Sequence, residues 1–307
     1  MRRFPRPALL LAAARALPAA AAGAGAPLLR SDLAALPESI RRESLAAVDR
    51  ACDSLREAAD PAAPAPWPEG LAPAAALSDA GSPDPLLSNA LARAAASVSR
   101  PWGAAETRDA AYVLLGAAWA GATPPPALLD RLARADLSAL RPAERAFALV
   151  ALDSFGADSA AGWDALARRA VPPSPALADV AAAALARAAR SRRNGGDGAS
   201  PDVLAHARWI AARLHLGFGG ADDPANPLDP ESALLCAILA SSLPRRDLAA
   251  DPALFPWDWR NHLANRLVTR QLVDPATYEY HWDGGASGAP RRLATAQAAL
   301  ALRLLAR

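Results

Sequence analysis

Carboxylates are the side chains of this sequence best suited to chemistry, because three aspartates stand out by their surroundings. Asp153 lies alone in the otherwise apolar segment 147–155, and Asp258 and Asp283 lie near the rims of predicted loops. A glycosidase or lyase needs two carboxylates that face one cleft, about 5 to 10 Å apart. These three aspartates are the catalytic candidates, although a buried aspartate on an apolar helix can equally cap or bridge a neighbouring helix.

Metal ions and covalent nucleophiles have no support in the residue spacing. No serine, cysteine or glycine-loop motif of the usual nucleophile or phosphate-binding kinds occurs. We therefore expect no metal site and no cofactor. The histidines lack the paired spacing of metal ligands, and they are His206, His215, His262 and His281.

The composition is that of a folded protein with a thin, extended core. Of 307 residues, 52% are hydrophobic and 21% are charged, which excludes disorder as the dominant state. Much of the apolar fraction is alanine, which favours helix but buries little area per residue, so many slim helices are expected. The net charge is +2 and the basic residues are scattered arginines, which predicts no nucleic-acid partner.

The first 26 residues have the order of a secretory signal peptide. Arginines at positions 2, 3 and 6 precede the apolar stretch 8–22, and small residues follow as far as Ala26. We expect a mature domain of residues 27–307 that is periplasmic or secreted. No transmembrane span is expected after signal removal, because the longest later apolar stretch, 110–122, is too short for a bilayer.

Two cysteines lie far apart in the mature chain. In an exported protein the pair Cys52 and Cys236 can form a disulfide. Both also lie in apolar helical stretches, where an unbridged cysteine packs as a small hydrophobe. The sequence leaves both alternatives open.

Hydrophobic periodicity predicts an all-α chain without strands. In the segment 38–59, Leu45, Val48, Cys52 and Leu55 recur three and four residues apart and share one helical face. An irregular stretch is expected at 60–85. Further helices are predicted at 86–98, 107–121, 126–137, 142–155, 160–171, 176–190, 201–216, 230–242, 257–272 and 293–307.

The predicted helices have marked ends and are of two kinds. Asp229, followed by a proline and a glutamate, has the residues of a helix start, and Gly121 and Gly156 are placed as helix stops. The segment 233–240 is apolar on all sides, whereas the helix at 201–216 has a single apolar stripe. One-sided helices are expected outside and all-round apolar helices inside, which predicts concentric layers as a ring or a solenoid.

Gln271, Trp282 and Thr295 follow one another along the C-terminal stretch, and this order resembles one repeat of the squalene cyclase and prenyltransferase α/α toroids. In that family an outer helix ends in glutamine, a loop returns a glycine and a tryptophan onto it, and an inner helix opens with a Thr-Ala step. Gln271, Trp282 and Thr295 stand in that order here, although Tyr280 replaces the expected glycine. The resemblance covers about the last fifty residues. It implies a single α/α-toroid domain of about five to six hairpins, in which Gln271, Trp282 and Thr295 are structural.

The catalytic groups of that family have no counterpart in this sequence. The D-x-D-D acid of the cyclases is missing, since Asp222-Asp223 lacks the first aspartate, and Leu234 stands where a zinc-binding aspartate would precede Cys236. The resemblance therefore implies a non-catalytic binding or scaffold module of the cell envelope, facing an envelope protein or a small molecule. The alternative is an enzyme that acts on an isoprenoid or carbohydrate in the central cavity. The binding candidates are Trp257, Trp259, His281 and Trp282.

Overall fold

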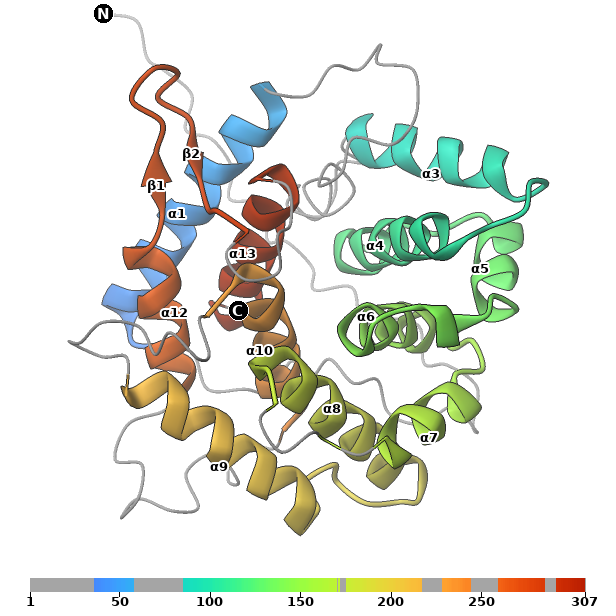
Figure 1. Cartoon of the computed structure of the whole chain (residues 1–307). Helices are drawn as coiled ribbons and strands as arrows, with labels where there is room; N and C mark the ends of the chain where they lie inside the picture. Colours follow the sequence, from blue (N-terminus) through green and yellow to red (C-terminus); the bar gives the residue numbers. More distant parts are fainter. Residues whose placement is uncertain are drawn as a thin grey trace, which may run out of the picture.

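The computed structural model describes residues 36–57, 85–169, 171, 175–216, 228–243, 259–284 and 291–306, and these residues are mostly helical. The described part holds eleven α-helices, one 3-10 turn and one short hairpin (Figure 1). The elements are α1 (Glu38–Glu57), α3 (Pro85–Ser97), α4 (Ala104–Ala120), α5 (Pro126–Ala133), η1 (Leu137–Ala139), α6 (Pro142–Ser154), α7 (Ala160–Arg168), α8 (Leu177–Arg193), α9 (Pro201–Leu216), α10 (Pro230–Ser242), α12 (Trp259–Thr269), β1 (Leu272–Val273), β2 (Tyr280–His281) and α13 (Arg291–Leu305).

The helices begin and end close to where the sequence predicts. Asp229 is the N-cap of α10, and its carboxylate accepts a 2.7 Å hydrogen bond from the backbone N–H of Ser232. Gly121 ends α4 in the left-handed conformation, with φ of 68°, and Gly156 has the same φ after α6. The predicted irregular stretch 60–85 lies almost wholly outside the described residues.

The absence of strands was a wrong prediction. Leu272 and Val273 pair antiparallel with His281 and Tyr280 in a hairpin between α12 and α13. Each strand is two residues long, so neither contains enough alternation to leave a period-two pattern in the sequence. The hairpin takes the place of the predicted loop.

Burial separates the helices into two sets. In α10 every residue is buried, and α4, α6, α8 and α13 are buried over most of their length. By contrast α5 and α7 bury only a narrow stripe, such as Leu128 and Leu132 in α5. Along the buried set, α4 packs on α6, α6 on α8, α8 on α10, and α10 on α13. The expectation of buried and one-sided helices is therefore confirmed.

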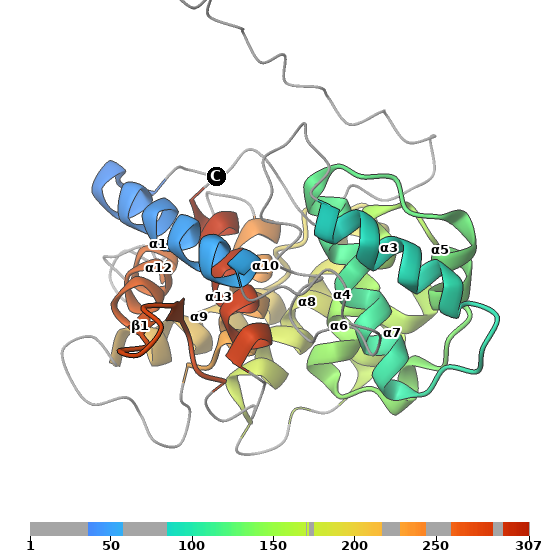
Figure 2. The same cartoon turned by 90° about the horizontal axis from the view of Figure 1, so that it is seen from above.

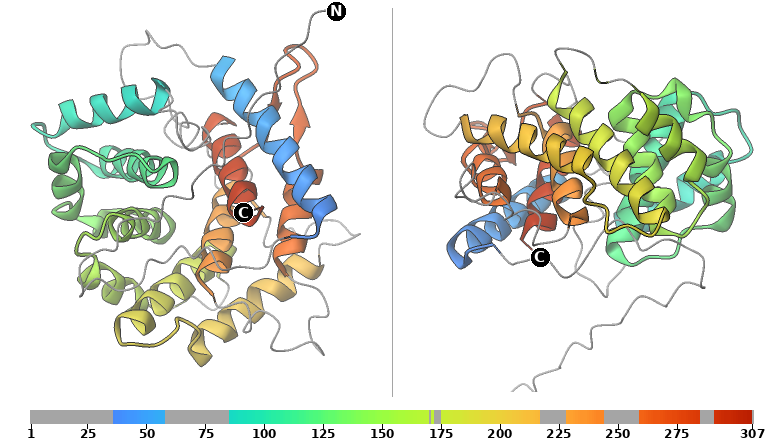
Figure 3. Two further views of the ribbon diagram at one scale, coloured as in Figure 1. Left: turned by 180° about the vertical axis from the view of Figure 1, so that it is seen from behind. Right: turned by 90° about the horizontal axis from the view of Figure 1, so that it is seen from below.

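The first helix packs against the end of the chain. The helix around Cys52, α1, contacts α12, α13 and β2, as Figure 3 shows from behind. Arg41 of α1 donates a 3.0 Å hydrogen bond from Nε to the carbonyl of Ala306. Seen from above, α1, α12 and α13 lie on one side of α10, while α3, α5 and α7 lie on the other (Figure 2). None of the described helices is both long and apolar enough to cross a bilayer.

Candidate functional site

Trp282 ties the end of α12 to the start of α13. The side chain is buried, and its indole Nε1 donates a 2.8 Å hydrogen bond to the carbonyl of Leu267 in the last turn of α12. Its backbone N–H donates to Oγ1 of Thr295 at 3.1 Å, and that hydroxyl donates to the carbonyl of Arg291 at 2.8 Å. The structure thus brings Trp282 and Thr295 together in a packed junction between two helices.

Gln271 follows α12 in the chain, but its side chain bonds a different helix. Its Oε1 accepts from Nε and Nη2 of Arg50 at 3.0 and 2.7 Å, and its Nε2 donates to the carbonyl of Ala47 at 2.8 Å. Both partners belong to α1. The amide therefore fastens α1 to the hairpin, and Trp282 satisfies the α12 carbonyl instead.

The other C-terminal candidates divide between buried and exposed positions. Trp259 is buried within α12, and His281 is buried with Nε2 at 3.7 Å from Oδ1 of Asp283. The Asp283 side chain is 63% exposed, as expected for a turn. Trp257 and Asp258 lie outside the described residues. In the described part, the structure therefore assembles no opposed acid pair from the aspartates proposed from the sequence.

Asp153 bridges two helices. One oxygen accepts a 2.8 Å hydrogen bond from Nε1 of the buried Trp163, and the other accepts from the hydroxyl of Ser159, the N-cap of α7. Burial raises the pKa of Asp153, although these two hydrogen bonds oppose the shift. With both oxygens engaged, Asp153 fixes the end of α6 to α7, which is the structural role that the sequence left open.

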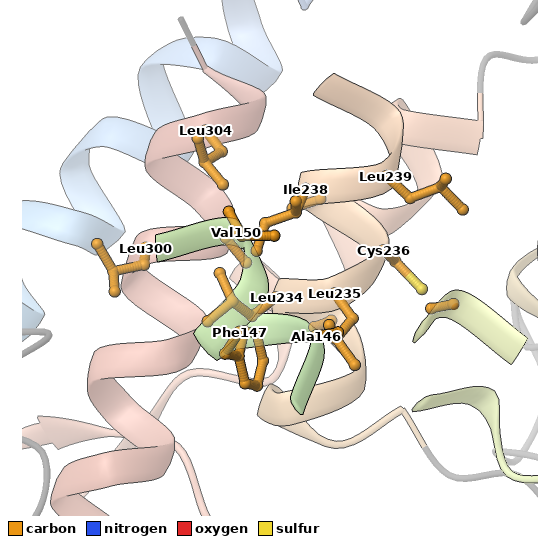
Figure 4. Close-up of a cluster of buried hydrophobic side chains, with 14 of the residues drawn as sticks. Ala146, Phe147, Val150, Leu234, Leu235, Cys236, Ile238, Leu239, Leu300 and Leu304 are labelled. Atoms are coloured by element: carbon orange, nitrogen blue, oxygen red, sulfur yellow. The ribbon is translucent and has the colours of Figure 1, made fainter. Parts of the chain in front are cut away.

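Both cysteines are buried as thiols and do not form a disulfide. Cys52 lies on the packed face of α1, and Cys236 lies within α10 (Figure 4). Burial, the largest influence, raises the pKa of the Cys236 thiol. A buried thiol with a raised pKa is a poor nucleophile, so Cys236 packs as a small hydrophobe.

A group of charged residues that the sequence analysis did not select lies at the N-terminal ends of α6 and α10. Arg141 donates from Nη1 and Nη2 to the two carboxylate oxygens of Glu231 at 3.2 and 2.8 Å, and from Nη2 to Oε1 of Glu144 at 3.0 Å. Asp229 precedes Glu231 and caps α10. We call Arg141, Glu144, Asp229 and Glu231 the acid cluster, in which all three carboxylates are largely buried.

The two glutamates converge on one nitrogen. Because Oε1 of Glu144 and Oε1 of Glu231 both bond Nη2 of Arg141, these oxygens are less than about 6 Å apart. Burial raises the pKa of Glu231, with Arg141 opposing the shift, and burial likewise raises the pKa of Asp229. Burial therefore favours the protonated form of both acids at the start of α10.

A buried polar pair joins α4 and α13. Nε2 of Gln297 on α13 donates a 2.7 Å hydrogen bond to the hydroxyl of Tyr112 on α4. Burial and the negative charge of Glu231 raise the pKa of Tyr112, so the phenol keeps its proton. This bond joins the first and last helices of the buried set.

Weak sequence signals existed for these residues. Glu144 and Glu231 each follow a proline in the first turn of a helix. A negative side chain there is stabilised by the positive end of the helix dipole, so neither glutamate needs another explanation from the sequence. Gln297 and Tyr112 interrupt segments that are otherwise apolar on all sides. A polar residue on a fully apolar helix is the signal that could have selected the pair.

The space between α6, α10 and α13 is filled by apolar side chains. Phe147 and Val150 of α6 lie beside Leu234 and Ile238 of α10 (Figure 4). Phe147 is 1% exposed and stacks at a tilt on Tyr112, with 5.4 Å between the ring centroids. The middle of the buried set is thus packed.

Comparison of the chain with protein-family models, with curated proteins and with solved structures finds no match in any of the three. The described residues also contain no group of three or more histidine, cysteine, aspartate or glutamate side chains arranged to hold a metal ion.

Proposed function

We propose that the chain is an exported α/α toroid that acts as a non-catalytic binding or scaffold module of the cell envelope. The order of contacts supports the toroid, since each buried helix packs on the next and the Gln297–Tyr112 hydrogen bond joins α13 to α4. The junction around Trp282 and Thr295 is consistent with the resemblance to a squalene cyclase or prenyltransferase repeat. Residues 27–307 form one domain in this proposal.

The observation that carries the non-catalytic function is the packed middle of the buried helices. An enzyme acting inside the ring would need an open space between α6, α10 and α13, where Phe147 and Val150 instead meet Leu234 and Ile238 (Figure 4). Arg141 also occupies both glutamates of the acid cluster. These contacts favour binding by the faces of the ring over chemistry within it.

Replacing Phe147 tests the packed middle directly. If Phe147 fills a closed core, Phe147→Ala costs about 3 to 5 kcal/mol of unfolding free energy, measured by urea denaturation. If Phe147 lines an open cavity, the same change has little effect on stability and the proposal fails. Leu272→Ala is the matched control, because Leu272 is 44% exposed.

Export is tested separately by N-terminal sequencing of the protein from its native host. We expect the mature chain to begin near Pro27, after the run of small residues. A chain that retains Met1 would contradict removal of a signal peptide.

The second candidate is an enzyme that acts on a carbohydrate or an isoprenoid, and one observation favours it. Glu144 and Glu231 converge on Nη2 of Arg141, and burial raises the pKa of Glu231 as a general acid requires. Turnover of an oligosaccharide or a prenyl diphosphate that is lost in Glu231→Gln and kept in Glu43→Gln would establish the enzyme. Glu43 is an exposed residue of α1.

A further inference from the structure

The exposed large apolar side chains of the described protein gather on the hairpin between α12 and α13. Leu272 and Val273 of β1 are 44% and 45% exposed, and Tyr278 in the turn is 76% exposed. Within the described residues, no other large hydrophobic side chain is exposed. The hairpin reaches beyond α12 and α13 at one edge of the molecule, as Figure 1 shows. An exposed apolar patch that is confined to one projecting element marks a binding surface.

Hydrogen bonds fix the turn that carries Tyr278. Oδ1 of Asp274 accepts from the backbone N–H groups of Ala276 at 2.9 Å and of Thr277 at 3.4 Å. Oδ2 of Asp274 accepts from Nη1 of Arg291 at 3.1 Å, and its carbonyl accepts from the N–H of Tyr278 at 2.8 Å. Tyr278 has a φ of 59°, a conformation that residues other than glycine rarely adopt. The turn therefore holds Tyr278 exposed in a strained backbone conformation, which is a common property of binding sites.

The base of the hairpin is fastened to α1. The backbone N–H of Tyr280 donates to Oγ of Ser54 at 2.8 Å, and the guanidinium of Arg50 lies 5.0 Å from the centre of the Tyr280 ring. Gln271, which precedes β1, bonds Arg50 and the carbonyl of Ala47. These contacts hold the hairpin on the helices, so binding by the turn requires little further ordering of the chain.

The charges around the hairpin balance. The turn contains no charged side chain between Pro275 and Tyr278. Across residues 270–283 and the first two residues of α13, three arginines stand against three acids, and these are Arg270, Arg291, Arg292, Asp274, Glu279 and Asp283. An uncharged apolar tip above balanced charges favours an apolar partner over a strongly charged one.

The shape of the apolar surface narrows the choice of partner. Adjacent residues of a strand point to opposite faces, so Leu272 and Val273 make both faces of the hairpin apolar, and a flat protein surface could cover only one. The three exposed side chains present on the order of 300 Å², well below the roughly 800 Å² per partner that a stable protein interface buries. A second copy of the chain would therefore bind the hairpin weakly. A lipid surface surrounds an inserted tip on all sides, and tyrosine is enriched at the boundary of bilayer and water.

We propose that the tip of the hairpin inserts into the surface of a lipid bilayer and attaches the protein to it. Leu272, Val273 and Tyr278 enter the boundary between headgroups and acyl chains, while the ion pair of Arg291 and Asp274 stays at the level of the headgroups. The proposal rests on the envelope function proposed above and specifies the surface to which the exported protein binds.

Co-sedimentation of the mature chain with lipid vesicles tests the tip. The probes are vesicles of phosphatidylcholine and vesicles of equal parts phosphatidylcholine and phosphatidylglycerol. Because the charges around the hairpin balance, we expect binding to both with similar affinity. Leu272→Asp places a charge in the inserted surface, and Tyr278→Gly removes the ring but tolerates the φ of 59°. Each change should weaken binding about tenfold. Ala92→Asp adds the same charge at an exposed position of α3 and should bind as the wild type does.

A fluorescence measurement locates the contact. Tyr278→Trp adds an indole at the tip, and phosphatidylcholine with brominated acyl chains quenches indoles that lie among the chains. We expect these vesicles to quench a larger fraction of the fluorescence in Tyr278→Trp than in the wild type. Equal quenched fractions would show that the tip stays outside the bilayer.

Three further results would overturn the attachment. The first is the absence of binding to both vesicles by a chain with wild-type helicity and melting temperature. The second is binding that Leu272→Asp and Tyr278→Gly leave unchanged, which would assign it to another surface. The third is a dimer, seen by analytical ultracentrifugation, that Leu272→Asp dissociates, because the hairpin would then bind a second copy. A native protein that retains Met1 would contradict export and leave the vesicle result for residues 27–307 intact, so the two failures are distinguishable.

Discussion

The indole nitrogen of Trp282 lies 2.8 Å from the carbonyl oxygen of Leu267 and donates to it, so the residue that follows β2 bonds the last turn of α12. The last carbonyls of a helix have no partner within the helix, and here the indole supplies one. The hydrogen bond thereby gives Trp282 a structural role in the described fold.

Replacement of Trp282 should destabilise the protein strongly. Trp282→Ala loses burial and leaves a cavity, which costs on the order of 3 kcal/mol. Trp282→Phe keeps an aromatic ring but loses the N–H, and should cost about 1 to 3 kcal/mol for the unsatisfied carbonyl and imperfect packing. Urea unfolding of both variants measures the effect. Asp283→Asn, beside it but exposed, is the control and should leave the midpoint unchanged.

Asp153 should behave as a structural bridge. Asp153→Ala leaves the indole N–H of Trp163 unpaired in a fully buried place, with an expected cost of about 2 to 3 kcal/mol. Asp130→Ala, at an exposed position of α5, should cost little. Calorimetric melting compares the two, and equal melting temperatures would contradict the bridge.

Tyr112 and Gln297 should be coupled in a double-mutant cycle. Tyr112→Phe removes the acceptor of the Gln297 amide, and Gln297→Leu removes the donor. Because either change breaks the same hydrogen bond, the double variant should lose less unfolding free energy than the sum of the two single variants. We expect a coupling energy of about 1 kcal/mol in unfolding free energy. Additive effects would show that the bond between α4 and α13 contributes nothing to stability.

The contribution of Asp229 and Glu231 to stability should fall as the pH rises from about 4. Burial raises the folded-state pKa of Asp229 and Glu231 above their ordinary values of 3.8 and 4.5, so the folded chain holds protons that the unfolded chain has released. The stabilisation from these two carboxyls is fully present when the pH is below their ordinary pKa values. It is lost as the pH rises through their raised folded-state pKa values. Urea unfolding between pH 4 and 8 should show a shallower fall in Glu231→Gln. Glu43→Gln should reproduce the wild-type slope.

The sequence predicted the helices better than it predicted the site, and particular residues show why. Proline and glycine at helix ends act locally, so the starts at Pro142 and Pro230 and the stop at Gly121 were predictable from neighbouring residues. The partner of Arg141 is Glu231, ninety residues away, and no local pattern contains such a pair. Gln271 likewise bonds Arg50 across most of the chain.

Hydrogen bonding explains the remaining differences. Asp153 was a catalytic candidate because a lone acid on an apolar helix is unusual, but the donors that satisfy it, from Ser159 and Trp163, lie beyond the end of that helix. Glu231 was interpreted as a helix-dipole residue, a role that accounts for its type without predicting its contact with Arg141. Residues with a sufficient local explanation are therefore the ones whose long-range partners sequence reasoning misses.

The packing of α1 on α13 affects how the protein can fold. Arg41 bonds the carbonyl of Ala306, 265 positions along the chain, and Leu55 and Val48 of α1 are buried. Contacts of such sequence separation slow folding, because a long loop must close before they form. On a chain synthesised from its N-terminus, α1 is made before the other described helices, and its contacts with α13 are among the last that can form. The apolar face of α1 that packs on α13 therefore stays exposed to solvent, or bound to a chaperone, until residues 291–305 have been synthesised.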